Sequence, residues 1–108
     1  MKKRLNHSEK ELEILRNIEA NPNVTQRQMA KDLGMSLGKT NYLIQALLAK
    51  GFIKINNFKR SDNKLGYLYL LTPEGIEMQA KLTVLFLERK SEEYNKLKKE
   101  MERIKNYE

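Results

Sequence analysis

Helix start and stop signals recur three times within the first 51 residues, and they restrict this part of the chain to short helices joined by tight turns. A capping box formed by Ser8 and Glu11 predicts the start of the first helix, which a proline-containing turn ends. A second capping box, formed by Thr25 and Gln28, opens the next helix. Ser36 caps a third helix soon afterwards. The short turn between the second and third helices predicts a helix-turn-helix.

Apolar residues recur at helical spacing in all three segments, which gives each helix one hydrophobic face. Gly34 and Gly51 end the second and third helices, because glycine readily adopts the left-handed conformation that a helix C-terminus often needs. We therefore expect three helices around one small core. The expected inward-facing residues are Leu12, Ile14, Leu15, Ile18, Met29, Ala30, Leu33, Leu43, Ile44, Leu47 and Leu48.

The period changes beyond residue 51. Residues 52–56 and 67–71 alternate like strands, and the polar, basic residues 57–66 between them predict a hairpin with a long loop. Thr72 and Pro73 then begin a helix that could continue to about residue 106. The expected fold is mainly α with a small β-hairpin, divided into a domain of residues 1–72 and a long C-terminal helix of residues 73–108.

The net charge of +7 is distributed unevenly along the chain. Residues 1–72 contain 13 Lys and Arg against 6 Asp and Glu, whereas residues 73–108 contain 8 of each. No acidic residue occurs between Asp32 and Asp62, a gap of 29 residues. This division suggests one part that binds an anion and another that binds a protein. On charge alone, nucleic-acid binding and simple solubility remain equal alternatives.

The composition excludes several kinds of site. The chain has no cysteine and one histidine, which excludes disulfides, thiolate metal sites and centres that need several imidazoles. His7 precedes the first helix without an orienting acid, so we expect no enzyme, metal or cofactor. No apolar run is long enough to span a membrane, and the basic residues 1–4 are followed by a polar segment rather than a signal peptide. We expect a cytoplasmic protein.

The order of three helices, a basic hairpin and a long helix resembles a winged helix-turn-helix, and it is similar to the MarR family of bacterial and archaeal transcription regulators. The resemblance rests on residues 25–36 (TQRQMAKDLGMS), 47–53 (LLAKGFI) and 71–75 (LTPEG), and it covers roughly residues 8–80. More narrowly, the chain looks like the small regulators associated with extracellular-polysaccharide gene clusters. The resemblance implies a homodimer that binds double-stranded DNA without a cofactor and acts as a repressor.

The chain also departs from the pattern of this family. The wing of typical members carries an Asp-x-Arg triplet, whereas the matching triplet here is Asp62-Asn63-Lys64, so we expect Arg60 to take over the role of the arginine. Typical members are longer and dimerise through helices at both ends, and here the last helix is expected to do most of that work. Many members bind a small ligand beside the dimer region, but the shortened dimer region here predicts no particular effector.

The third helix is the predicted recognition helix. With Thr40 and the apolar residues facing the core, its opposite face carries Lys, Asn and Gln side chains, which suit the base edges of a major groove. Basic and amide side chains near the second helix and in the wing are expected to meet phosphates. The predicted base-reading residues are Ser36, Gly38, Lys39, Asn41, Tyr42 and Gln45. The predicted phosphate contacts are Gln26, Arg27, Gln28, Lys59, Arg60 and Lys64.

The last helix carries a narrow apolar stripe in its second half, which is typical of a two-stranded coiled coil. Its first half has a wider stripe and is expected to pack on the winged domain. The alternative is a long helix that folds back on its own domain. The predicted dimer contacts are Leu87, Tyr94, Leu97, Met101 and Ile104.

Two other functions remain open at this point. A winged fold with a long helix also suits a protein-interaction module in a larger assembly. Tyr67 and Tyr69 alternate on a strand and could stack on single-stranded bases, which would indicate RNA binding.

Overall fold

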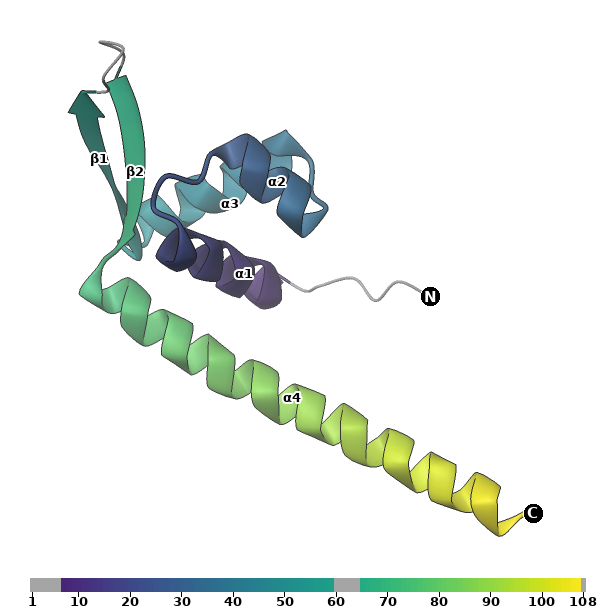
Figure 1. Cartoon of the computed structure of the whole chain (residues 1–108). Coiled ribbons are helices and arrows are strands. Elements are labelled where there is room, and N and C mark those ends of the chain that lie inside the picture. Colours follow the sequence, from purple (N-terminus) through teal and green to yellow (C-terminus); the bar gives the residue numbers. More distant parts are fainter. Residues whose placement is uncertain (1–6, 60–64, 108) are drawn as a thin grey trace.

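The computed structural model of the chain describes residues 7–59 and 65–107 and shows four helices with one β-hairpin (Figure 1). The predicted order of elements is confirmed. The elements are α1 (His7–Ala20), α2 (Gln26–Leu33), α3 (Leu37–Ala49), β1 (Ile53–Lys59), β2 (Leu65–Leu71) and α4 (Pro73–Asn106).

The start of α1 differs from the prediction. The helix already includes His7, so Ser8 lies inside its first turn and is not the capping residue. Glu11 is only 6% exposed and accepts a hydrogen bond from Lys50 Nζ at 2.9 Å. A carboxylate that is buried in this way is stabilised by a cation from a distant element, here the end of α3.

The predicted starts of α2 and α3 are confirmed. Gln28 N donates to Thr25 Oγ1 at 3.1 Å, and Thr25 N donates to Gln28 Oε1 at 3.0 Å, which completes the capping box. Ser36 Oγ accepts from Lys39 N at 3.1 Å and caps α3. Gly34 has a φ of 64°, the left-handed conformation that lets the chain leave α2 and enter α3 after two further residues.

The hairpin is longer than predicted. β1 and β2 pair in antiparallel register from Ile53 opposite Leu71 to Lys59 opposite Leu65, so both predicted strands extend into residues 57–66. The polar residues 56 and 57 are exposed and do not interrupt the ladder, because strand pairing uses backbone groups. The hairpin is fixed to the helical part by Tyr69 N, which donates to Pro22 O at 3.1 Å.

One hydrophobic core joins the helices and the base of the hairpin. The helix α1 lies at its centre and contacts α2, α3, β2 and α4 (Figure 1). The helical spacing of apolar residues predicted most of this core. The buried cluster contains Leu12, Ile14, Leu15, Ile18, Val24, Met29, Leu43, Ile44, Leu47, Ile53, Tyr69 and Leu82.

The long helix α4 begins beside the base of the hairpin. Thr72 Oγ1 accepts from Gly75 N at 3.0 Å, and Pro73 occupies the first turn, as predicted. Leu82 and Phe86 pack against the core, and Arg89 forms an ion pair with Glu9 of α1. Further along, α4 leaves the domain and continues alone to Asn106 (Figure 1). Among the described residues, no helix is long and apolar enough to cross a membrane.

Candidate nucleic-acid interface

The inner face of α3 determines which of its residues remain accessible. Thr40, Leu43, Ile44 and Leu47 are fully buried at 0% exposure, and Thr40 Oγ1 donates to Ser36 O at 2.9 Å. The opposite face is therefore held in one orientation by the core. All six residues that the sequence predicted for base reading are exposed, namely Ser36, Gly38, Lys39, Asn41, Tyr42 and Gln45.

Lys39 and Tyr42 interact on this exposed face. The ammonium of Lys39 lies 5.4 Å from the centroid of the Tyr42 ring, within the range of a cation–π contact, and Tyr42 is 61% exposed. The contact keeps a positive charge and an aromatic ring side by side in solvent. Such a pair can meet both a phosphate and the edge of a groove.

Ser36 and Gly38 present backbone rather than long side chains. Ser36 is occupied by its capping role, although its hydroxyl hydrogen can still be donated to another group. A Cβ added to Gly38 would meet no atom within 4 Å, so the fold itself does not require a glycine there. Because Gly38 has no side chain, the helix backbone is accessible at this end of the exposed face.

Leu37 lies beside these residues and was missed by the sequence prediction. It is 42% exposed at the start of α3. Residues four apart lie on the same side of a helix, so Leu37 shares a side with Asn41 and Gln45. That spacing was the available signal in the sequence.

The N-terminal turn of α2 supplies one accessible cation. Arg27 is exposed, and the described part of the structure shows no hydrogen bond or ion pair for its side chain. Gln26 Nε2 donates to the hydroxyl of Tyr69 at 3.3 Å, and Gln28 Oε1 takes part in the capping box. The two glutamine side chains therefore position α2 and the hairpin, while Arg27 points its charge into solvent.

Acidic residues are kept away from the exposed face of α3. In the described chain up to Leu71, the carboxylates lie on α1 and at Asp32 near the end of α2. Glu11 and Glu9 on α1 form ion pairs with Lys50 and Arg89. A polyanion that approaches α3 would therefore meet basic and neutral side chains.

Residues 7–54 match the family described as winged helix-turn-helix DNA-binding. The chain has a winged helix-turn-helix fold. In this fold α2 and α3 form the helix-turn-helix, and β1 with β2 forms the wing. No curated protein sequence matches the chain.

Solved structures show the same fold. A MarR/EmrR family transcriptional regulator from Acinetobacter sp. ADP1 is 21% identical, with a TM-score of 0.61 over 76% of this chain and 56% of that chain. A MarR transcriptional regulator from Methanosarcina mazei Go1 is 19% identical, with a TM-score of 0.58 over 74% and 56%. A MepR variant from S. aureus, bound to an oligodeoxyribonucleotide, is 20% identical, with a TM-score of 0.57 over 88% and 75%.

The predicted resemblance to the MarR family is thus confirmed at the level of the fold. The chain spans little more than half the length of the first two of these regulators.

The wing contains three of the predicted phosphate contacts. Lys59 is the last residue of β1 and pairs through its backbone with Leu65. Arg60 and Lys64 lie outside the described residues. The proposed roles of these three cations therefore remain predictions.

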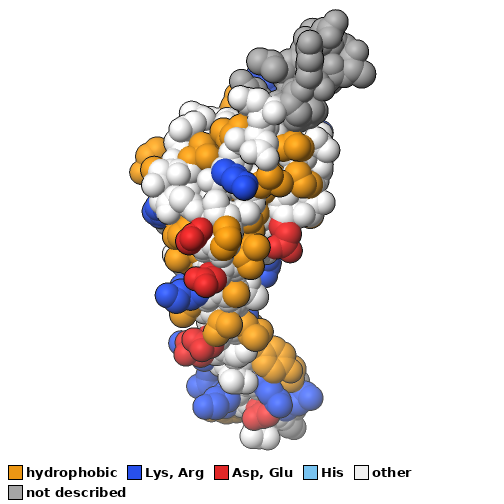
Figure 2. All heavy atoms as spheres, turned by 90° about the vertical axis from the view of Figure 1, so that its left-hand side faces the viewer, with side chains coloured by type: hydrophobic (Ala, Val, Ile, Leu, Met, Phe, Trp, Pro, Cys, Tyr) orange, Lys and Arg blue, Asp and Glu red, His pale blue; other side chains and the backbone are white. Residues whose placement is uncertain are grey.

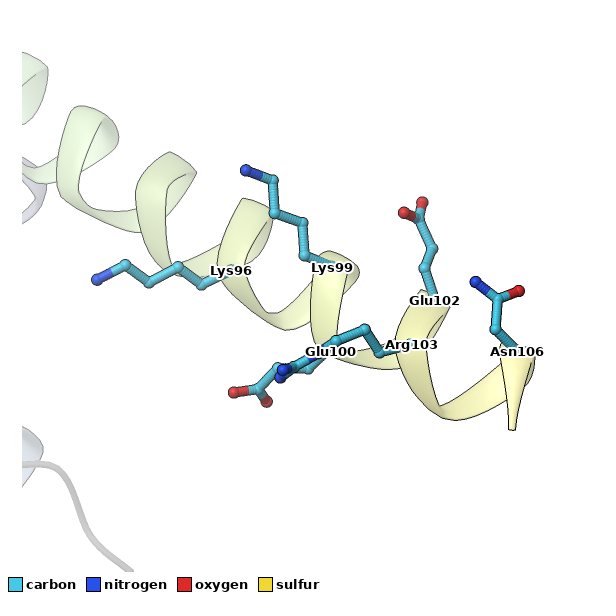
Figure 3. Close-up of a pocket in the computed structure, with 6 residues that line it drawn as sticks. All are labelled: Lys96, Lys99, Glu100, Glu102, Arg103 and Asn106. Atoms are coloured by element: carbon cyan, nitrogen blue, oxygen red, sulfur yellow. The ribbon is translucent and has the colours of Figure 1, made fainter. Parts of the chain in front are cut away.

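The predicted dimer residues lie on the accessible surface of α4. Leu87, Tyr94, Leu97, Met101 and Ile104 are each between 50% and 65% exposed. Figure 2 shows hydrophobic side chains on the helix below the winged domain, between charged ones. Six polar side chains of the last turns point outward around the helix and line an open hollow that belongs to α4 alone (Figure 3). The apolar and polar faces of this helix are therefore clearly separated.

Proposed function

We propose that this protein is a transcription regulator that binds specific sequences of double-stranded DNA as a homodimer and represses transcription in the cytoplasm. The observation that carries the proposal is the exposed face of α3, which combines Lys39, Asn41 and Gln45 and contains no acid. The fold that it shares with the DNA-bound MepR variant supports the same conclusion. The proposal assigns DNA binding to residues 1–72 and dimerisation to residues 73–108.

Base reading would use the side chains of α3. The amides of Asn41 and Gln45 can donate and accept at the same time, which suits the N6 and N7 atoms of adenine, and Lys39 suits guanine. Leu37 can contact the methyl group of thymine. Replacing thymidine by deoxyuridine in a bound site removes that methyl group, and unchanged affinity at every position would contradict the assignment.

Phosphate contacts would hold the domain in register on the duplex without reading its sequence. The exposed Arg27 and the backbone groups at the start of α2 would meet one strand, and the wing would meet the next groove. The assigned phosphate contacts are Gln26, Arg27, Gln28, Lys59, Arg60 and Lys64.

A homodimer would present two recognition helices to two half-sites about one helical turn apart. A single winged domain contacts only one short half-site. A dimer binds the two half-sites more tightly, because once one domain is bound the second contact becomes intramolecular. A dimer that occupies a promoter prevents polymerase from binding there, which is the basis for proposing repression.

The buried position of Tyr69 weakens the RNA alternative. Tyr69 is only 7% exposed, and its hydroxyl accepts a hydrogen bond from Gln26. A ring that packs in the core cannot offer its face to a base. At residue 69, the alternation along the strand therefore reflects packing in the core and not base stacking.

The proposal is tested by selecting bound duplexes from a random pool and footprinting the enriched sequence. We expect a partly palindromic site that competes far better than a random duplex at the same salt concentration. Transcription in vitro from a promoter containing that site should fall when the protein is added. Enrichment of no sequence, or tighter binding to single-stranded RNA of equal length, would contradict the proposal.

A further inference from the structure

The helix α4 has two apolar faces that point in different directions. One face packs on its own domain through Gly75, Leu82 and Phe86, and Arg89 extends it toward Glu9. The other face follows steps of three and four residues along the whole helix, and we call it the seam. The seam contains Ile76, Ala80, Thr83, Leu87, Lys90, Tyr94, Leu97, Met101 and Ile104.

The seam lies to the side of the domain-facing surface. Ile76, Thr83 and Leu87 each directly follow a domain-facing residue in the sequence, and one residue corresponds to a rotation of about 100° around the helix axis. The large apolar residues of the seam remain at least half exposed in the single chain, including Ile76 in the first turns. The seam is therefore uncovered from one end of α4 to the other.

The recognition face of α3 points away from α4. The helix α1 contacts α4 on one side and α2 and α3 on the other (Figure 1). The buried face of α3 points toward this centre, so its exposed face looks in the opposite direction. The wing also rises from the start of α4 toward the side away from it (Figure 1). The exposed face of α3 and the wing thus both lie on the side of the domain away from α4.

This direction restricts how two copies can be arranged around one duplex. If the two α4 helices were parallel, the two-fold axis would run along them, and the recognition faces would point in opposite directions. If they are antiparallel, the axis runs perpendicular to both helices. Because the domain lies about 100° from the seam, both domains then fall on the same side of the helix pair. Both recognition faces can meet one duplex only in this arrangement.

We propose that two copies of this chain pair through their seams with the α4 helices antiparallel and both winged domains on one side. This inference rests on the homodimer proposed above and adds its geometry. In this arrangement the second half of α4, which extends beyond its own domain, packs along the first half of the α4 helix of the partner subunit.

The side chains of the seam match in this arrangement. With the helices centred near residue 89, Ala80 lies opposite Leu97 of the partner subunit, and Thr83 lies opposite Tyr94 of the partner subunit, so a small residue faces a large one in these two layers. In the central layer, Lys90 lies opposite Leu87 of the partner subunit. Ile76 meets Met101 of the partner subunit. Beside the seam, Glu77 comes next to Lys98 of the partner subunit, an attractive pair that occurs twice by symmetry.

A parallel pair would have its own charge complementarity. Glu93 would lie beside Lys98 of the partner subunit, and Glu100 beside Lys105 of the partner subunit. However, the two copies of Lys90 would face each other within the seam, and Ala80 would face only Ala80. The opposed recognition faces remain the decisive argument against this arrangement.

The absence of cysteine from the chain allows a direct test by disulfide formation in the full-length protein. We would prepare Ala80→Cys and Leu97→Cys separately, mix them so that subunits exchange, and oxidise. The mixture should form a disulfide-linked dimer of the two variants. Neither variant alone should do so, because identical residues at 80 or 97 would be separated by about 26 Å along the antiparallel pair, far beyond the reach of a disulfide.

Glu102→Cys is the matched control, because Glu102 points outward on the polar side of the helix shown in Figure 3. This variant measures the background of disulfides that form when separate molecules collide at random. Efficient linkage of Leu97→Cys with itself would overturn the proposal in favour of a parallel pair. No linkage in the mixture above the Glu102→Cys level would also overturn it. Light scattering and titration of the unmodified protein with its selected duplex separate this result from a failure to dimerise or to bind DNA.

Discussion

Gly75 packs directly against the backbone of Phe52: a Cβ added to Gly75 would lie 1.9 Å from the Phe52 carbonyl oxygen. This contact joins the start of α4 to the residue before β1, and the Thr72 amide reinforces it by donating to Phe52 O at 3.1 Å. The position of the long helix relative to the winged domain therefore depends on a residue without a side chain.

Gly75→Ala should destabilise the protein, because the new methyl group has no space beside a backbone carbonyl. We expect a loss of about 1–3 kcal/mol in the free energy of unfolding, measured by urea denaturation. Gly38→Ala serves as the control, since its added methyl group meets no neighbour. Equal stability of Gly75→Ala and the parent would show that the contact is looser than described.

Gly38→Ala should lower the affinity for DNA without lowering the stability of the fold. In the free protein, alanine favours the helix by up to about 1 kcal/mol relative to glycine, so the stability should be unchanged or higher. The affinity for the selected duplex should fall, because the methyl group stands between the backbone of α3 and the floor of the groove. Unfolding curves and a duplex titration on the same preparation measure both effects. Unchanged affinity would mean that this end of α3 does not approach the DNA.

Asn41→Ala and Gln45→Ala should each relax the sequence preference of binding. Every base contact that is lost is expected to cost about 1–3 kcal/mol against the selected site and little against a random duplex. Asn95→Ala on the polar side of α4 removes the same amide group far from the proposed interface and should change neither affinity. If the ratio of specific to random binding is unchanged in both α3 variants, the recognition helix has been assigned wrongly.

Replacing Lys59, Arg60 and Lys64 together by Ala should weaken binding to all duplexes similarly. The slope of log affinity against log salt should become shallower by the contribution of up to about three phosphate contacts. The matched control is Lys96, Lys99 and Arg103 replaced by Ala, which removes the same charge from α4. Equal slopes for the two triple variants would exclude the wing from the interface. Arg60→Ala alone should reduce any preference for AT-rich flanks, whose narrow minor groove attracts arginine.

Leu97→Asp with Met101→Asp should separate the subunits, because two carboxylates would enter the apolar seam of each helix. The winged domain should stay folded, since its core lies upstream of both residues. We expect a monomer that retains weak, salt-sensitive binding and loses tight binding to a palindromic site. Asn95→Asp with Asn106→Asp adds the same charge outside the seam and should remain dimeric. Light scattering combined with a duplex titration decides between these outcomes.

The features that arise from neighbouring residues could be predicted from the amino-acid sequence. Thr25, Ser36 and Thr72 were recognised as helix caps because each bonds to a backbone amide three residues away. The exposed face of α3 followed from the 3.6-residue period, once Leu43 and Leu47 were placed in the core. These interactions are local, so a local pattern is sufficient to predict them.

The features that depend on distant partners could be seen only in the folded protein. The sequence around Glu11 indicated a capping box, whereas the ion pair between its buried carboxylate and the half-exposed Lys50 at the end of α3 depends on packing. The alternation at Tyr69 also allowed an exposed stacking residue, whereas its burial and the hydrogen bond from Gln26 place it in the core. The length of the hairpin depended on pairing across the ladder, which tolerates polar residues on an exposed ribbon. No periodicity along the chain encodes such contacts, because their stabilisation exists only when the elements are packed together.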